Sequence, residues 1–285
     1  MSIDAHHHVW DPVEREHPWL DAPVLDPLRR AFDTDELRPQ AHAAGVHATV
    51  VVQTVTEDWE TPELLRLAAR DPLVAGVVGW TDLTDPAVAD RLAALAAGPG
   101  GERLVGIRHQ VQLEPDPGWI LRPDVLRGLA AVAAAGLAYD LVITPGQLPA
   151  ATEAAARLPQ LAFVLDHLGK PPVAAGGTDP WASALRDFAR LPNTSAKLSG
   201  LVTEADWAHW TVEQLRPYAE TALDAFGPDH LMFGSDWPVC TLAAGYAEVL
   251  QTAEQLTERL TIAERTEVFE GTAARIYRLR PDDRG

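Results

Sequence analysis

The chain is poor in cysteine, in lysine and in long hydrophobic runs. The first and the last of these shortages each argue against a class of protein. Its one cysteine, Cys240, cannot form an intrachain disulfide, which is typical of proteins from a reducing cytoplasm. The longest apolar stretch, residues 128–139, is too short and too rich in alanine to span a bilayer. The first residues lack the basic and apolar segments of a signal peptide. We therefore predict a cytoplasmic protein.

The charge of the chain is strongly one-sided, with a formal net charge of −18 over 285 residues. Nucleic acids and anionic membrane surfaces would be repelled by such a chain, so neither is expected as a partner. The hydrophobic content of 47% suffices for one barrel-sized core. Prolines and glycines are scattered and mark no linker, so we predict one domain over residues 1–285. A homo-oligomer is compatible with these features.

Short β-branched runs alternate with helical stretches along the whole chain. The helical stretches have apolar residues three and four positions apart, and this alternation predicts a parallel sheet with crossover helices. A (β/α)8 barrel with an additional C-terminal helix over 261–278 fits best. A doubly wound open sheet fits less well, because the first strand–helix turn lacks a glycine-rich phosphate loop. The predicted strands are 3–8, 48–53, 74–80, 104–109, 138–143, 161–166, 194–199 and 230–235.

Three consecutive histidines occupy the first predicted strand, in the segment DAHHHVWD. Alternate side chains of a strand share a face, so His6 and His8 should point one way and His7 the other. Taken alone, the histidines could simply be satisfied by local hydrogen bonds. The pair His6 and His8 is better interpreted together with the polar side chains at the ends of the other predicted strands.

Polar and titratable side chains follow nearly every predicted strand. A barrel gathers the carboxyl ends of its strands on one face, so we expect these side chains to lie together. Both lysines of the chain fall at such ends, in a chain with 21 arginines, which suggests a chemical role rather than a surface one. The residues at these ends are His6, His8, Trp10, Gln53, Trp80, Asp82, Arg108, His109, Gln110, Asp140, Asp166, His167, Lys170, Lys197, Ser199, Asp236 and Trp237.

Five segments in order resemble one known family. DAHHHVWDP, GIRHQVQ, DHLGKPP, KLSGL and FGSDWP are similar to motifs of the amidohydrolase superfamily, in its amidohydrolase-related branch. That branch contains sugar-lactone hydrolases such as L-rhamnonolactonases and L-fuconolactonases. The resemblance extends from residue 3 to about residue 240. It implies a distorted (β/α)8 barrel that hydrolyses a cyclic ester, with His6, His8, His167 and Asp236 at its centre.

The chain departs from the family in one respect that concerns metal binding. Relatives that hold one metal firmly usually take another histidine from strand five, whereas YDLVITPGQ has none. One divalent metal, zinc by preference, could still bind to His6, His8 and Asp236, with His167 as a further ligand. Three protein ligands and a water are common at catalytic zinc. Catalysis without metal is equally open, because a lactone carbonyl is more electrophilic than an amide.

Lactone hydrolysis needs a base for water, donors for the carbonyl oxygen and a proton for the leaving alkoxide. Asp236 is the best general base, although an aspartate here could instead cap the eighth helix. His6 and His8 would polarise the carbonyl, and His167 would orient water or the carbonyl oxygen. Lys170 and Lys197 would stabilise the oxyanion.

The remaining polar and aromatic strand-end residues are expected to bind the substrate. Indoles suit the C–H face of a sugar ring, although simple packing explains most tryptophans. Because positive charge is scarce at the site, a neutral or singly charged lactone fits better than a dicarboxylate. A metal-dependent decarboxylase and a non-catalytic binding barrel are the alternatives. The expected substrate contacts are Trp10, Trp80 and Trp237 for the ring, and Gln53, Asp82, Arg108, His109, Gln110 and Asp140 for hydroxyls.

Overall fold

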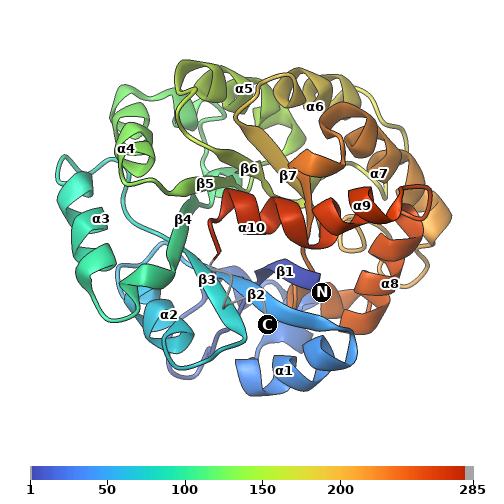
Figure 1. The fold of residues 1–285 in the computed structure, drawn as a ribbon, viewed down its shortest axis with the longest axis horizontal. Helices are drawn as coiled ribbons and strands as arrows, with labels where there is room; N and C mark the ends of the chain where they lie inside the picture. The colour runs from blue at the N-terminus through green and yellow to red at the C-terminus, as the bar shows by residue number, and fades with distance from the viewer. Residues whose placement is uncertain (1, 280–285) are drawn as a thin grey trace.

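Eight parallel strands form a barrel in the computed structural model, which describes residues 2–279 (Figure 1). Each strand pairs with the next in chain order. The barrel closes where β8 meets β1: the Asp236 N–H donates to His6 O at 2.8 Å, and the His8 N–H donates to Trp237 O at 2.7 Å. The predicted barrel is therefore confirmed. The strands are β1 (Ser2–His7), β2 (Val46–Val52), β3 (Val74–Gly79), β4 (Leu104–His109), β5 (Ala138–Leu141), β6 (Phe163–Leu165), β7 (Thr194–Leu198) and β8 (Leu231–Phe233).

A ring of helices surrounds the strands and buries their outer faces (Figure 1). Local sequence defines several helix starts: the Asp33 side chain accepts from the Glu36 N–H at 2.9 Å, and Thr211 forms a capping box with Gln214. No described helix is long and apolar enough to cross a membrane. The ring consists of α1 (Thr34–Ala43), α2 (Glu60–Ala68), α3 (Val88–Ala97), α4 (Pro123–Ala134), α5 (Leu148–Arg157), α6 (Trp181–Ala189), α7 (Val212–Phe226) and α8 (Tyr246–Leu256).

The predicted C-terminal helix is present, but it is divided. It consists of α9 (Ile262–Thr266), one π-helical turn (Glu267–Gly271) and α10 (Thr272–Ile276). In Figure 1, α10 lies across the barrel, and its end joins the buried cluster inside the strands. This segment therefore closes the amino end of the barrel and leaves the carboxyl end for the site.

The inner faces of the strands carry unusually small side chains. Barrel interiors are commonly filled by bulky branched residues. Here four of the inward positions are alanines, and the space is filled from the C-terminal segment by Ala273, Tyr277 and Leu279. The amino half of the barrel is thus an apolar core to which the C-terminal segment contributes. The four alanines are Ala5, Ala48, Ala75 and Ala138.

Candidate active site

A cavity of about 270 Å³ opens at the carboxyl ends of the strands. Pockets for drug-sized ligands have volumes of roughly 300–1,000 Å³. This cavity lies at the lower end of that range, so it suits a smaller molecule of the size of a monosaccharide. Six residues singled out from the sequence line this cavity. They are His8, Arg108, Gln110, His167, Lys170 and Asp236.

Three histidines converge on one carboxylate oxygen at the floor of the cavity. Asp236 Oδ1 lies 3.7 Å from His6 Nε2, 3.5 Å from His8 Nε2 and 3.8 Å from His167 Nε2. The two strand-one rings are nearly perpendicular, at 85°, with their Nε2 atoms 3.1 Å apart. His6 and His8 therefore lie on the same side of β1, as the alternation of side chains along a strand predicts.

Asp236 is held by the backbone that closes the barrel. Its φ of 58° lies in the left-handed region, and its N–H is fixed to the first strand as described above. Such a conformation costs free energy in a non-glycine residue and is common at functional sites. Asp236 does not cap α8, whose N-cap is Gly245, so the capping interpretation does not hold.

Two glycines permit the close packing of the histidines. Gly200 has a φ of 65°, and a Cβ there would meet His167 Nδ1 at 2.6 Å. A Cβ at Gly234 would meet the His6 Cβ at 2.7 Å. Any larger residue at these positions would displace the two imidazoles that approach Asp236.

Hydrogen bonds orient the imidazole rings. His8 Nδ1 lies 2.7 Å from the Val52 carbonyl oxygen, so Nδ1 carries the proton and the Nε2 lone pair faces the cavity. His167 Nδ1 lies 2.9 Å from Ser199 Oγ. The Nε2 atom of His8 can therefore accept a proton or bind a cation, whereas the tautomer of His167 is left open by its hydroxyl partner.

Burial sets the protonation states on the cavity floor. Burial lowers the pKa of His6 well below its ordinary value and lowers the pKa of His167 to about 4. Burial alone would raise the pKa of Asp236, but His167 and His8 outweigh it and hold that pKa below its usual value. At neutral pH His6 and His167 are therefore neutral and the carboxylate of Asp236 is ionised, which is the form a general base requires.

A buried ionic layer lies directly beneath the cavity floor. The Lys197 ammonium lies 2.5 Å from Asp140 Oδ2, 2.9 Å from Asp166 Oδ1 and 3.1 Å from His6 Nδ1. Lys197, Asp140 and Asp166 all have 0% side-chain exposure. Lys197 and Asp140, expected to contact the substrate, instead support His6 from below.

Arg108 extends from this layer into the cavity wall. Its Nη1 donates to Asp166 Oδ2 at 2.8 Å, and its Nε donates to Gln53 Oε1 at 3.1 Å. Gln53 is fully buried and therefore orients the guanidinium rather than the substrate. Arg108 thus presents a fixed positive charge to the cavity.

The donor set of the floor fits a divalent metal. His6, His167 and Asp236 each offer one ligand atom, and these atoms lie within 4.8 Å of one another. The Nε2 atom of His8 adjoins that of His6 and could serve as a fourth ligand. Imidazole and carboxylate are common zinc ligands. The guanidinium nitrogen Arg108 Nη1 lies 3.3 Å from His6 Nε2 and would oppose the charge of a cation there.

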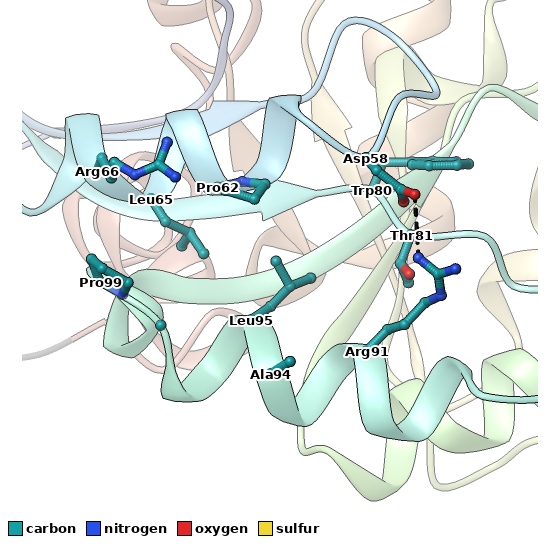
Figure 2. Close-up of a pocket in the computed structure, with 11 residues that line it drawn as sticks. Asp58, Pro62, Leu65, Arg66, Trp80, Thr81, Arg91, Ala94, Leu95 and Pro99 are labelled. Atoms are coloured by element: carbon teal, nitrogen blue, oxygen red, sulfur yellow. Dashed lines mark hydrogen bonds and ion pairs between the residues drawn. The ribbon is translucent and has the colours of Figure 1, made fainter.

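The tryptophans expected at the sugar ring pack elsewhere. Trp10 donates from Nε1 to the Leu28 carbonyl oxygen at 3.0 Å, and Trp237 is 1% exposed against Phe32. Trp80 lies in a hollow on the outer wall between α2 and α3, where Leu65 and Leu95 face each other (Figure 2). These placements replace the expected stacking platforms, because the rings fill space between loops and helices.

Two further polar residues expected at the substrate are used within loops. His109 accepts from Trp80 Nε1 at 3.0 Å, lies 2.8 Å from Glu114 and stacks on Trp119. Asp82 accepts from the Thr84 N–H at 2.8 Å and its hydroxyl at 2.7 Å. Neither side chain lines the cavity, so Arg108 and Gln110 are the expected substrate contacts that do.

The cavity wall also contains residues that the strand ends could not reveal. Trp19 and Trp207 supply the indoles at this cavity, from the β1–α1 and β7–α7 loops. Glu204 lies there too, 3.6 Å from Lys170, and burial raises the pKa of its carboxyl group. The only sequence signal for them was their position in strand-to-helix loops, which tertiary structure folds over the site.

Comparison with known proteins shows which family the chain belongs to. The chain matches the amidohydrolase family over residues 3–279. It is 41% identical to the L-fucono-1,5-lactonase of Burkholderia multivorans, over 98% of this chain and 96% of that protein. It is 38% identical to the L-fucono-1,5-lactonase of Burkholderia ambifaria, with the same coverage.

Solved structures give the same relationship. A crystal structure of an amidohydrolase from Burkholderia multivorans with bound HEPES superposes with a TM-score of 0.92 at 41% identity, covering 98% of this chain and all of that one. A second crystal form of that protein, with bound zinc, gives a TM-score of 0.91 at 40% identity and the same coverage. The chain therefore belongs to the amidohydrolase family.

Proposed function

We propose that this protein hydrolyses the ester bond of a sugar-derived lactone. The observation that carries this proposal is the convergence of three buried imidazoles on the carboxylate of Asp236, beside Arg108, at the floor of a sugar-sized cavity. The similarity to L-fucono-1,5-lactonases over nearly the whole chain supports it. L-Fucono-1,5-lactone is accordingly the first substrate to test.

In the proposed mechanism Asp236 is the general base. It takes a proton from water while the water oxygen forms a bond to the lactone carbonyl carbon. The carbonyl π electrons move onto oxygen, and Arg108 and Lys170, which both line the cavity, stabilise that negative charge. The low pKa of Asp236 keeps it ionised, and so able to accept the proton, at neutral pH.

Collapse of the tetrahedral intermediate then opens the ring. The carbonyl re-forms, the bond to the ring oxygen breaks, and the leaving alkoxide takes the proton held by Asp236. His167, 3.8 Å from that carboxylate, can hand the proton across the cavity. The product is a hydroxy acid that ionises in solution.

A divalent metal is compatible with the same residues. His6, His167 and Asp236, with His8, would hold it, and when bound it would supply carbonyl polarisation and a more acidic water. The roles of Arg108 and Lys170 in binding the substrate do not depend on it.

The upper wall of the cavity suits a polyhydroxylated, uncharged ring. Glu204 and Gln110 can bind hydroxyl groups, and the Trp19 and Trp207 indoles provide apolar surface for C–H groups. A carboxylate-bearing lactone would place its charge beside Glu204 and Asp236, which disfavours dicarboxylates.

A pH-indicator assay tests the proposal directly. We expect proton release from L-fucono-1,5-lactone and related 1,4- and 1,5-lactones above the rate of spontaneous opening. Carbon dioxide release from an aromatic acid, without lactone turnover, would instead identify a decarboxylase. A ligand-induced rise in melting temperature without turnover of any kind would identify a binding barrel. Either outcome would contradict the proposal.

A further inference from the structure

A buried carboxylate outside the ionic layer holds the loop that follows β2. Glu60 is the first residue of α2, is 3% exposed and takes no part in the proposed reaction. Its Oε1 accepts from the Thr54 N–H at 2.7 Å and from the Thr54 hydroxyl, and its Oε2 accepts from the Val55 N–H at 3.2 Å. Three donors from two consecutive loop residues thus converge on one side chain.

The carboxyl group of Glu60 can hold this loop in either protonation state. Burial raises the pKa of Glu60 to about 7, although the bonds from Thr54 and Val55 and the charge of Arg108 lower it. The contacts to Thr54 do not depend on that titration, because the carbonyl oxygen of a protonated carboxyl group also accepts hydrogen bonds. An apolar side chain here would leave the donors unpaired, so the loop would have to move to satisfy them.

The segment that Glu60 holds supports an amide of the cavity wall. Gln110 Nε2 donates to the Thr54 carbonyl oxygen at 2.7 Å, and both residues line the cavity. With Nε2 fixed in this way, Oε1 is the amide atom of Gln110 that can accept a hydrogen bond from a ligand. Glu60 therefore fixes the loop residue against which this acceptor is oriented.

The same segment supports the guanidinium group of the cavity by a second route. Gln53 Nε2 donates to the Val55 carbonyl oxygen at 3.1 Å. Gln53 Oε1 accepts from Arg108 Nε at 3.1 Å and from Arg108 Nη2 at 3.0 Å, whereas Asp166 holds Nη1 from the other side. The Gln53 amide thus joins the loop to two of the three guanidinium nitrogens. One buried carboxylate therefore underlies an acceptor and a cation of the cavity wall.

We propose that Glu60 is a positioning residue for the polar wall of the cavity. Through the Thr54–Val55 segment it sets the places of the Gln110 amide and the Arg108 guanidinium. The wall then offers a hydroxyl acceptor and a positive charge at fixed positions, and fixed positions of binding groups favour reaction of a bound molecule. The effect on catalysis rests on the proposed lactonase function, whereas the positions of the two side chains do not.

Thr61 supplies a matched control on the same helix. Its hydroxyl donates to the Trp80 carbonyl oxygen at 2.8 Å and accepts from the Trp80 N–H at 2.7 Å, so it too joins α2 to a strand-to-helix loop. Trp80, however, does not line the cavity. Glu60→Met and Thr61→Val therefore each remove a buried polar contact between α2 and a neighbouring loop, but only the first contact leads to the cavity.

The side-chain amide signals of Gln53 and Gln110 in ¹H–¹⁵N spectra report these positions without reference to activity. We expect both signals to shift in Glu60→Met and to stay unchanged in Thr61→Val. For the lactone we expect kcat/KM to fall by roughly 10- to 100-fold in Glu60→Met, because displaced binding groups lower the rate even when the reacting atoms are untouched. Thr61→Val should lower the melting temperature but keep kcat/KM within about twofold, because its loop holds no cavity group.

Glu60→Gln covers the case of a Glu60→Met protein that does not fold. Its single amide oxygen can replace the acceptor for Thr54 but not also the acceptor for Val55. In this variant we therefore expect the Gln110 signal to stay near its wild-type position and the Gln53 signal to shift.

Two results would overturn the positioning role. One is a pair of unchanged Gln53 and Gln110 signals in folded Glu60→Met or, where that protein does not fold, an unchanged Gln53 signal in Glu60→Gln. The other is an equal loss of kcat/KM in Glu60→Met and Thr61→Val. Absence of lactone turnover in the wild type would refute the proposed function instead, because the amide signals would still decide the positions.

Discussion

The two lysines of this chain occupy two very different regions of the same barrel. Lys170 lies in the cavity wall with a side-chain exposure of 28% and forms an ion pair with Glu204 at 3.6 Å. Lys197 lies beneath the floor with no exposure and three close partners. The first can meet a substrate, whereas the second can only hold protein groups. One residue type at similar strand ends thus lines the cavity in one region and lies beneath its floor in the other.

The largest loss of activity should come from a substitution of Asp236, which lies between these two regions. Asp236→Asn keeps the size of the side chain but removes the base. We expect kcat to fall by about 10²–10⁴-fold, the usual contribution of positioned acid–base catalysis, with little loss of substrate binding. Steady-state kinetics with metal content measured on the same samples checks this. A variant with unchanged metal and a rate within a few-fold of wild type would rule out the general-base role.

Removing the buried lysine should damage both stability and rate. Lys197→Met leaves Asp140 and Asp166 without their shared cation, and breaking a buried pair in this way costs about 3–5 kcal/mol. We also expect kcat to drop by roughly 10–100-fold, because His6 loses its support. Denaturant unfolding and kinetics measure the two effects. If the unfolding free energy did not change, the ionic layer would not have the supporting role assigned to it.

Removing the cavity lysine should affect rate alone. Lys170→Met deletes a partly exposed ion pair, which contributes at most about 1 kcal/mol to stability. If Lys170 binds the oxyanion or a substrate oxygen, kcat/KM should fall by about 10-fold or more. The comparison of melting temperatures and kcat/KM between the two lysine variants is the measurement. Similar losses of stability in both would abolish the distinction between the regions.

The smallest effect on rate should come from His7, whose ring points away from the cavity. Both of its nitrogens lack hydrogen-bond partners among the described residues, and burial lowers its pKa to about 3. We expect His7→Phe to keep kcat within about twofold, because a group outside the site contributes no acid–base catalysis. His6→Ala and His8→Ala, by contrast, should abolish turnover in the same assay.

His7 should nevertheless make stability depend on pH. The unfolded chain binds a proton at His7 below its ordinary pKa of 6.5, whereas the folded chain does not until about pH 3, so acid favours unfolding across that interval. The contribution at pH 5 is ~2 kcal/mol. The unfolding free energy of the wild type should therefore fall more steeply than that of His7→Phe between pH 6.5 and 5. Parallel curves would show that folding does not lower the pKa of His7.

Much of the fold could be read from local patterns. All eight predicted strands are present with ends displaced by a few residues, because β-branched runs and helical periodicity are properties of short segments. The C-terminal helix was predicted as one piece, but its π-helical turn at Glu267–Gly271 was not, since nothing in its local pattern differs from an ordinary helix.

The sequence by itself determined which side chains share a face, and tertiary structure decided how deep each one lies. Period-two alternation separates His6 and His8 from His7 but gives no depth along the barrel axis, so Lys197 and Asp140 could not be distinguished from residues of the cavity. The cavity indoles come from loops whose course depends on packing. The hydrogen bond from the Tyr277 hydroxyl to Asp140 joins positions 137 residues apart. Only closure of the barrel, with small residues left inside it, brings that hydroxyl under the active site.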